Sequence, residues 1–182
     1  MEVSHRFVVV SGIPGCGKST VGRALAEYLD TPYLDKDEIL ESMFDGLERS
    51  SEETRHRLSR AADQDFESKA LSCTGAVLDS FWRHPSADTQ SGTPSGWLAA
   101  PEIHSVEVLC GCPPELAAAR FLRRTSHSGH LDSAWGHASL IAQSQDLMHM
   151  LPLGVGALIE VDTAGAVDLK QLAARVKVAL EV

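Results

Sequence analysis

The sequence predicts a three-layer α/β fold in which a five-stranded parallel sheet carries helices on both faces. Along all 182 residues, short apolar runs that are typical of buried strands alternate with longer segments whose apolar residues recur at helical spacing. Such alternation favours a parallel sheet, because each crossover helix packs on one face of it. No internal repeat or change of composition marks a boundary, so we expect a single domain over residues 1–182.

The first strand, expected at residues 7–11, leads into the most informative stretch of the chain. It is an unbroken apolar run bounded by glycine, as a buried central strand requires. The next residues, 12–20, read GIPGCGKST and match the phosphate-binding pattern G-x-x-x-x-G-K-[ST] at each fixed position. A nucleoside triphosphate is therefore the expected ligand.

Each fixed position of this loop has a chemical reason. Glycines allow backbone N–H groups to turn toward the phosphates, and the following helix presents its positive end to them. Lys18 should reach the β- and γ-phosphates, and Ser19 should offer its hydroxyl to Mg²⁺. We expect the helix to begin at Thr20 and to end near Asp30. The predicted nucleotide-binding residues of the loop are Gly12, Gly15, Cys16, Gly17, Lys18, Ser19 and Thr20.

The remaining elements follow in regular alternation. A short second strand is expected at residues 33–34 and a third at 76–78, with a short helix over 39–44 and a longer one from a capping box at 50–53 to about 73. Turn-forming residues over 84–96 predict a mobile surface loop before a short helix that contains Trp97. The later segments are a strand at 106–110, a helix opened by Pro113 and Pro114, a polar stretch at 125–137, a helix at 138–150, a strand at 157–161 and a last helix over 169–180.

Composition limits the possible functions. The net charge is −9, from 25 acidic and 16 basic side chains, and no basic stretch interleaved with aromatic residues is present, so we expect no nucleic-acid partner. No apolar run is long enough to span a membrane and the N-terminus shows no signal-peptide pattern, which indicates a cytoplasmic protein. The four cysteines should be reduced structural thiols, because their spacing fits no zinc site.

Acidic residues follow both the second and the third predicted strand. Asp35 and Asp37 alternate after the second strand, and Asp79 closes the third. In open α/β sheets the carboxyl ends of the strands form the ligand-binding edge. One carboxylate of the pair could face Mg²⁺ and its waters, and the other an acceptor hydroxyl. The alternative is a solvated strand end with a helix N-cap at Asp37.

The phosphate loop followed by the segment LDKDEI, residues 34–39, resembles the nucleoside-monophosphate-kinase-like group of small P-loop kinases. Shikimate kinase, gluconate kinase, chloramphenicol phosphotransferase and zeta-toxin-type kinases are similar at these positions. The resemblance implies a P-loop fold with strand order 2-3-1-4-5, ATP and Mg²⁺ as cofactors, Asp35 in the water shell of the metal, and Asp37 as substrate ligand and catalytic base.

The same resemblance assigns roles to two arginines. Arg120 and Arg124 share one helical face, and in the similar kinases such a pair packs one guanidinium on the adenine and points the other at the phosphates. Arg120 therefore corresponds to the adenine contact and Arg124 to a catalytic residue. A solvated basic face is the alternative. The polar segment at about 125–137 would then be a small lid that keeps water from the γ-phosphate.

Candidate acceptor contacts lie at the end of the third strand. Asp79, Trp82 and Arg83 could bind the acceptor. Arg83 would contact an anionic or hydroxyl group of it, and Trp82 would stack on it. Packing in the core is at least as common a role for a tryptophan. His127, His130 and His137 do not have metal-site spacing, and one of them could contact substrate or phosphate.

These observations favour an ATP-dependent kinase that phosphorylates a hydroxyl of a small molecule, with Lys18, Asp37 and Arg124 as catalytic residues. A P-loop ATPase that switches a partner protein is the alternative from another class. A 5′-hydroxyl nucleic-acid kinase is a third possibility, against which the net charge of −9 argues. Either a monomer or a homodimer is compatible with the sequence, which does not name the acceptor.

Overall fold

The computed structural model describes residues 4–45, 51–124 and 136–181. The N-terminal half consists of β1 (His5–Ser11), α1 (Lys18–Leu29), β2 (Tyr33–Asp35), α2 (Lys36–Phe44), α3 (Glu52–Leu71) and β3 (Gly75–Asp79). Next come β4 (Trp82–Arg83), β5 (Thr93–Pro94), the short 3-10 helix η1 (Gly96–Ala99) and β6 (Ile103–Gly111). The chain ends with α4 (Pro114–Arg123), α5 (His137–Met148), β7 (Ala157–Asp162) and α6 (Leu169–Glu181).

The main sheet has five parallel strands in the order β2-β3-β1-β6-β7. With β6 and β7 as the fourth and fifth strands of the sheet, this is the predicted order 2-3-1-4-5. The predicted fold class is therefore confirmed. β1 lies in the centre, and its register places Val10 beside Asp79 of β3 and Val108 of β6.

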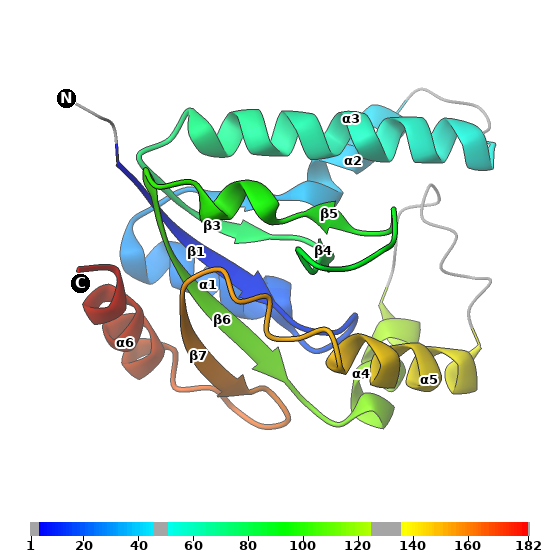
Figure 1. Cartoon of the computed structure of the whole chain (residues 1–182). Coiled ribbons are helices and arrows are strands. Elements are labelled where there is room, and N and C mark those ends of the chain that lie inside the picture. Colours follow the sequence, from blue (N-terminus) through cyan, green and yellow to red (C-terminus); the bar gives the residue numbers. More distant parts are fainter. Residues whose placement is uncertain (1–3, 46–50, 125–135, 182) are drawn as a thin grey trace.

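Helices cover both faces of this sheet (Figure 1). Alternate residues of β1 serve the two faces: Val8 and Val10 belong to the core beneath α1 and α6, whereas Phe7 and Val9 belong to the core beneath α2 and α3. A central strand that is buried on both sides needs apolar residues at every position, which explains the unbroken run in the sequence.

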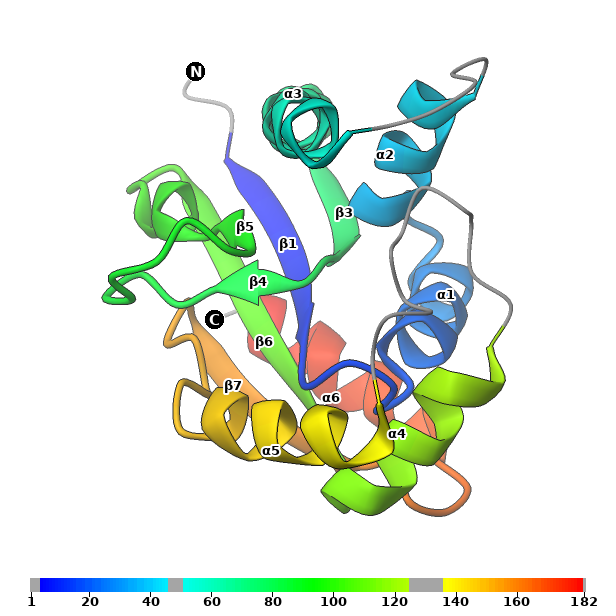
Figure 2. The ribbon, with the colours of Figure 1, turned by 90° about the vertical axis from the view of Figure 1, so that its right-hand side faces the viewer.

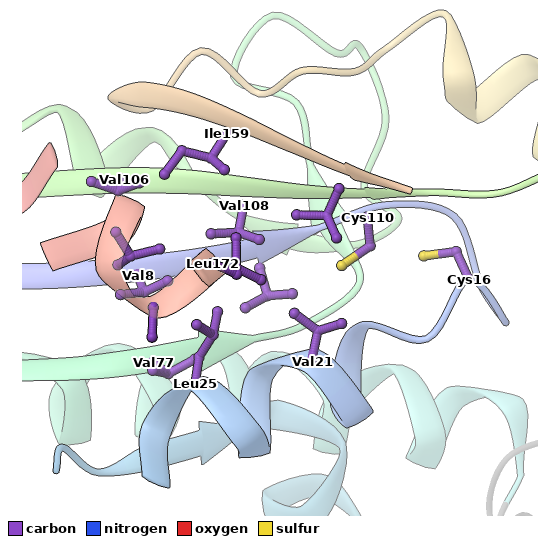
Figure 3. Packing of buried hydrophobic residues seen from close by; sticks show 14 of the residues in the cluster. Val8, Cys16, Val21, Leu25, Val77, Val106, Val108, Cys110, Ile159 and Leu172 are labelled. Atoms are coloured by element: carbon purple, nitrogen blue, oxygen red, sulfur yellow. The ribbon is translucent and has the colours of Figure 1, made fainter. Parts of the chain in front are cut away.

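The core on the α1 and α6 side is built from branched aliphatic residues (Figure 3). Its members include Val8, Val77, Val106, Val108, Ile159, Leu25 and Leu172. Removing such side chains from water is the main favourable contribution to folding. Within the described ranges, no helix is both long and apolar enough to cross a bilayer.

Two helices begin earlier than predicted. α1 begins at Lys18, not Thr20, because Gly17 adopts the left-handed conformation (φ 94°) and serves as the N-cap. α2 begins at Lys36, three residues before the predicted start, because the Asp35 side chain accepts a hydrogen bond from the backbone N–H of Asp37 at 2.9 Å. The N-cap is thus Asp35, and the alternative that placed the cap at Asp37 is wrong.

The segment 84–96 is more ordered than its composition suggests. Thr93 and Pro94 form β5, which pairs with Trp82 and Arg83 of β4. Thr93 and Ser95 are buried, so only residues 84–92 keep the irregular surface character that was predicted for the whole segment. The short helix predicted around Trp97 is present as η1.

A buried carboxylate joins the sheet to the connection that precedes β7. Glu107 of β6 is fully buried and accepts hydrogen bonds from the Ser11 hydroxyl at 2.7 Å and from the backbone N–H groups of Leu153 and Gly154 at 2.9 and 3.0 Å. Three donors compensate the carboxylate for its lost hydration. Because Ser11 directly precedes Gly12, this network also holds the first residue of the phosphate loop.

We predict that Glu107→Gln lowers the free energy of unfolding by about 2 to 4 kcal/mol, because the amide nitrogen would face backbone donors that need an acceptor. Urea unfolding followed by circular dichroism measures this change. Glu160→Gln, on the exposed side of β7, is the matched control and should leave stability unchanged. A Glu107→Gln protein as stable as this control would contradict the role given to the carboxylate.

Candidate active site

A large cleft lies at the carboxyl edge of the sheet, which faces the viewer in Figure 2. It has a volume of about 1870 Å³ and is bordered by the loop after β1, the ends of β2 and β3, the first half of α3, and the end of α4. Most predicted site residues line it, namely Gly15, Gly17, Lys18, Ser19, Thr20, Asp35, Asp37, Asp79, Arg120 and Arg124. The parallel strands therefore bring together residues that are far apart in the sequence.

The phosphate loop is held closely against the elements around it. A Cβ atom on Gly12 (φ 138°) would collide with the Cys110 carbonyl oxygen of β6, and one on Gly15 (φ 81°) with the Ala117 carbonyl oxygen of α4. Positive φ and close backbone approach both require glycine at these two positions. The pattern thus reflects packing of the loop as well as phosphate binding.

The Lys18 ammonium lies over this loop, where Nζ donates to the carbonyl oxygens of Gly12 and Ile13 at 3.1 and 3.2 Å. These contacts position its charge at the N-terminus of α1. Thr163, in the connection after β7, fixes the loop from behind, because its hydroxyl lies 2.6 Å from the carbonyl oxygen of Cys16 and 2.9 Å from that of Gly111. The sequence pattern gave no signal for Thr163, which becomes a neighbour of the loop only through the order of the strands.

Cys16 points away from the cleft into the core, near Cys110 (Figure 3). Burial raises the pKa of both thiols above the ordinary value, so neither is an activated nucleophile. All four cysteines are free, which agrees with the expected reduced, structural thiols. The lining of the cleft next to Cys16 comes from the backbone of the loop.

The two strand-end carboxylates meet through a tyrosine. β2 and β3 pair in a register that sets Asp35 beside Asp79, and the Tyr33 hydroxyl lies 2.8 Å from Asp79 Oδ2 and 3.2 Å from Asp35 Oδ2. Arg23 lies over the Tyr33 ring, with its guanidinium carbon 4.6 Å from the ring centroid. Tyr33 was not among the predicted site residues, although its position two residues before Asp35 puts both side chains on the same face of the strand.

This arrangement changes the protonation of the cluster. Burial, together with the negative charges of Asp79 and Asp37, raises the pKa of Asp35 to about 6. Burial and the two carboxylates also raise the pKa of Tyr33, so that it stays a neutral donor. A cation at this place would relieve the repulsion between the acids.

The oxygen donors at this edge fit Mg²⁺. The Ser19 hydroxyl and the carboxylates of Asp35 and Asp79 are hard ligands of the kind that Mg²⁺ prefers, and a bound nucleotide would supply further oxygens. Among the described residues, no group of three or more His, Cys, Asp and Glu side chains is arranged to hold a metal.

Asp37 differs from the other two acids in its surroundings. It lies in the first turn of α2, is half-buried, and lines the cleft. Within the described ranges, its carboxylate forms no hydrogen bond or salt bridge, whereas Asp35 and Asp79 both bind Tyr33. Asp37 therefore presents an uncommitted carboxylate to the cleft.

Arg120 lies in α4, but Arg124 follows the helix in an extended conformation, so the two do not share one helical face as predicted. Arg120 donates to the carbonyl oxygens of Thr163 at 3.0 Å and Ala164 at 3.4 Å, which fixes it beside the connection after β7. Arg124 follows the last residue of α4, and its guanidinium carbon lies 4.1 Å from the centroid of the Phe121 ring. Both line the cleft, as the sequence predicted for nucleotide contacts, but neither role is tested by this geometry.

Trp82 and Arg83 do not reach the cleft lining, in contrast to their predicted contact with the acceptor. Trp82 is buried, donates from Nε1 to the Val10 carbonyl oxygen at 2.9 Å, and packs edge-on against Phe66. Arg83 donates to the Thr89 carbonyl oxygen at 2.9 Å, so it supports the cleft wall from outside.

Some predicted features lie outside the described residues. These are His127, His130 and all of the predicted lid except its last two residues. The exception includes His137, which begins α5 and is exposed. No role is assigned to these histidines.

Comparison with known proteins agrees with this arrangement. A family model described as an AAA domain matches residues 8–134, which is more than half of the chain. The chain belongs to this family. The match begins in β1 and so includes the phosphate loop, the acidic pair, Arg120 and Arg124.

Among characterised relatives of this AAA-domain chain, a shikimate kinase from Ruegeria pomeroyi (strain ATCC 700808 / DSM 15171 / DSS-3) is 40% identical over 67 residues. That match covers 37% of the chain and 33% of the relative, so the chain spans about a third of the length of this curated relative. A match of this length indicates a shared segment of sequence. It does not establish that this chain has the activity of the relative.

Solved structures show the same fold. A candidate kinase from Chloroflexus aurantiacus J-10-fl superposes with a TM-score of 0.75 at 23% identity, over 97% of this chain and 99% of that one. A shikimate kinase from Bacteroides thetaiotaomicron superposes with a TM-score of 0.57 at 14% identity, over 97% and 98% of the two chains. The predicted resemblance to the small P-loop kinases is confirmed.

We predict that Asp35→Asn stabilises the protein at pH 7 when Mg²⁺ and nucleotide are withheld. The pKa of this carboxyl rises from 3.8 to about 6 on folding. Below about pH 4 the carboxyl is protonated in both the folded and the unfolded chain, and its contribution to stability is fully present. As the pH rises through about 6 the folded chain must carry the buried charge, and this contribution is lost. Each pKa unit corresponds to about 1.4 kcal/mol, so Asn should add up to about 3 kcal/mol at pH 7.

Urea unfolding in EDTA at pH 4 and pH 7 measures this effect, because the gain from Asn should vanish at pH 4. Glu102→Gln, at an exposed turn, is the control and should show the same stability as the parent at both pH values. A gain from Asp35→Asn that is equal at the two pH values would show that the cost of ionising this buried carboxyl is not its cause.

Proposed function

We propose that this chain transfers the γ-phosphoryl group of Mg·ATP to a hydroxyl group of a small molecule. The observation that carries the proposal is that one cleft contains the phosphate loop, the paired acids and a third carboxylate, Asp37, with no bonding partner among the described residues. The family and the shikimate kinase relative support a phosphotransferase of this kind.

Nucleotide binding would use groups that the fold already holds in place. The backbone N–H groups of the loop and the N-terminus of α1 would bind the phosphates, and Lys18 would exchange its carbonyl partners for the β- and γ-phosphate oxygens. Arg120 would lie beside the adenine of the bound nucleotide. Arg124 would lie near the phosphates. Both arginines would supply positive charge without rebuilding the loop.

Mg²⁺, when bound, would neutralise charge on the phosphates and on the transferred group. The Ser19 hydroxyl would be its direct protein ligand, and Asp35 and Asp79 would hold its water molecules. Tyr33 orients both carboxylates, because its hydroxyl lies within hydrogen-bonding distance of each. Phosphoryl transfer needs such positioning more than covalent help from the protein.

Asp37 is our candidate for the catalytic base. It lies two residues after Asp35, in the first turn of α2, and α2 packs against α3. A carboxylate with no competing partner is free to accept the proton of an incoming hydroxyl. The acceptor would thus lie between Asp37 and the first half of α3.

The proposal is tested by ADP release from Mg·ATP in the presence of hydroxyl-bearing compounds such as shikimate, gluconate, deoxyadenosine and simple sugars. Release without acceptor provides the baseline. Stimulation by one compound, together with its phosphorylated product in mass spectrometry, would establish a kinase. Steady hydrolysis that no compound changes would instead favour the P-loop ATPase class.

We predict that Asp37→Asn binds Mg·ATP with unchanged affinity but phosphorylates the acceptor about 10² to 10⁴ times more slowly, which is the usual contribution of general-base catalysis. A fluorescent ATP analogue measures binding, and coupled ADP release measures turnover. Glu38→Gln, the next residue of the same helix, is exposed and pairs with Arg23, so it should retain parental rates. If Asp37→Asn phosphorylated the acceptor at the parental rate, Asp37 could not be the catalytic base.

A further inference from the structure

A network of hydrogen bonds and one ion pair runs along the wall of the cleft, where Lys36, Ser59, Asp63 and Ser80 are lining residues, and it begins at a buried lysine. Lys36, the first residue of α2, is only 8% exposed. Its Nζ donates to Ser59 Oγ at 2.9 Å and lies 3.8 Å from Asp63 Oδ1. A buried ammonium group needs a counter-charge. Because Ser59 and Asp63 both belong to α3, this contact fixes the start of α2 to α3.

Asp63 extends the network to the opposite wall of the cleft. Its Oδ1 accepts a hydrogen bond from Thr93 Oγ1 at 2.8 Å, and Thr93 Oγ1 lies 2.6 Å from Ser80 Oγ. A hydroxyl has one proton, and the carboxylate can only accept. Thr93 therefore donates to Asp63, and Ser80 donates to Thr93. Ser80 and Thr93 are buried, which protects these bonds from competition with water.

Both ends of this network, Lys36 and Ser80, border the proposed site. Lys36 immediately precedes Asp37, and Ser80 immediately follows Asp79. Thr93 follows the segment 89–92, all four residues of which line the cleft. Thr93 is also anchored through its backbone N–H, which donates to the Phe81 carbonyl oxygen at 2.8 Å. The network thus spans the region between Asp37 and the wall formed by residues 89–92.

We propose that Asp63 is a positioning residue that sets the distance between Asp37 and the wall at residues 89–92, and thereby determines how tightly the acceptor binds. This inference rests on the proposed function, because the acceptor is defined there. Asp63 acts in two directions, on α2 through Lys36 and on the wall through Thr93. The phosphate loop and the arginine pair are not members of the network, so nucleotide affinity is independent of it.

Four variants separate this role from a general effect on stability. Thr93→Val removes the hydroxyl and keeps the shape of the side chain, whereas Thr93→Ser keeps the hydroxyl. Asp63→Asn removes the counter-charge of Lys36. Asp65→Asn is the control on the same helix, because Asp65 pairs with Lys69 at 2.9 Å on a more exposed surface and lines no part of the cleft.

The first measurement is kinetic and uses the compound of the ADP-release panel that stimulates most strongly. Loss of hydrogen bonds of this kind should raise the KM of that compound about tenfold in Thr93→Val and Asp63→Asn. The kcat and the affinity for a fluorescent ATP analogue should stay within about twofold of the parent. Thr93→Ser and Asp65→Asn should behave as the parent in all three quantities.

The second measurement needs no acceptor. Amide hydrogen exchange of the whole chain should become faster in Thr93→Val both at residues 89–92 and at residues 36–40, because the network couples these segments. Faster exchange that remains confined to residues 89–92, or an unchanged KM in Thr93→Val, would overturn the proposal. So would a raised KM of equal size in Asp65→Asn.

The two measurements also distinguish failure of the network from failure of the kinase assignment. If no compound stimulates ADP release, the proposed function is wrong, and with it the part of the inference that concerns the acceptor. Hydrogen exchange then still decides whether the network couples the two walls, and coupled exchange would retain Asp63 as a positioning residue of the cleft.

Discussion

The parallel alignment of the five strands is the constraint on which the site depends. Strands that run in the same direction end at the same edge of a sheet, so the phosphate loop after β1, the acids after β2 and β3, and Thr163 after β7 meet there. The register then sets Asp35 directly beside Asp79. Burial at this edge, together with the negative charges of Asp79 and Asp37, raises the pKa of Asp35.

Three buried or half-buried polar groups near this edge are tolerated because they have partners. Tyr33 lies between two carboxylates, Glu107 accepts three hydrogen bonds, and Lys36 lies beside Ser59 and Asp63. These contacts join the loop, the strand ends and two helices into a support with little freedom to shift, since an unpaired polar group in the interior costs free energy. Asp37 differs, because its carboxylate, which faces the cleft, has no hydrogen-bond or ion-pair partner among the residues that the structure describes.

Local sequence signals predicted the elements well and their ends less well. The apolar run of β1, the glycine pattern after it and the alternation of strands and helices were enough for the fold class, because each depends on residues close together in the chain. Helix starts were misplaced at Lys18 and Lys36, where backbone geometry at Gly17 and side-chain capping by Asp35 decide the boundary. Trp82 was considered for stacking on the acceptor or for packing in the core, and the structure shows it buried with its indole N–H bonded to the Val10 carbonyl oxygen.

The sequence by itself determined the phosphate loop, the acids after the second and third strands, and the arginine pair, because their spacing is set by local chain geometry. Only the tertiary structure decided which of these groups have partners. Tyr33 joins Asp35 to Asp79, Thr163 supports the loop from the connection after β7, more than a hundred residues away, and Asp63 links two walls of the cleft. Such contacts arise from strand order and helix packing, and residues far apart in the chain carry no local pattern that reveals them.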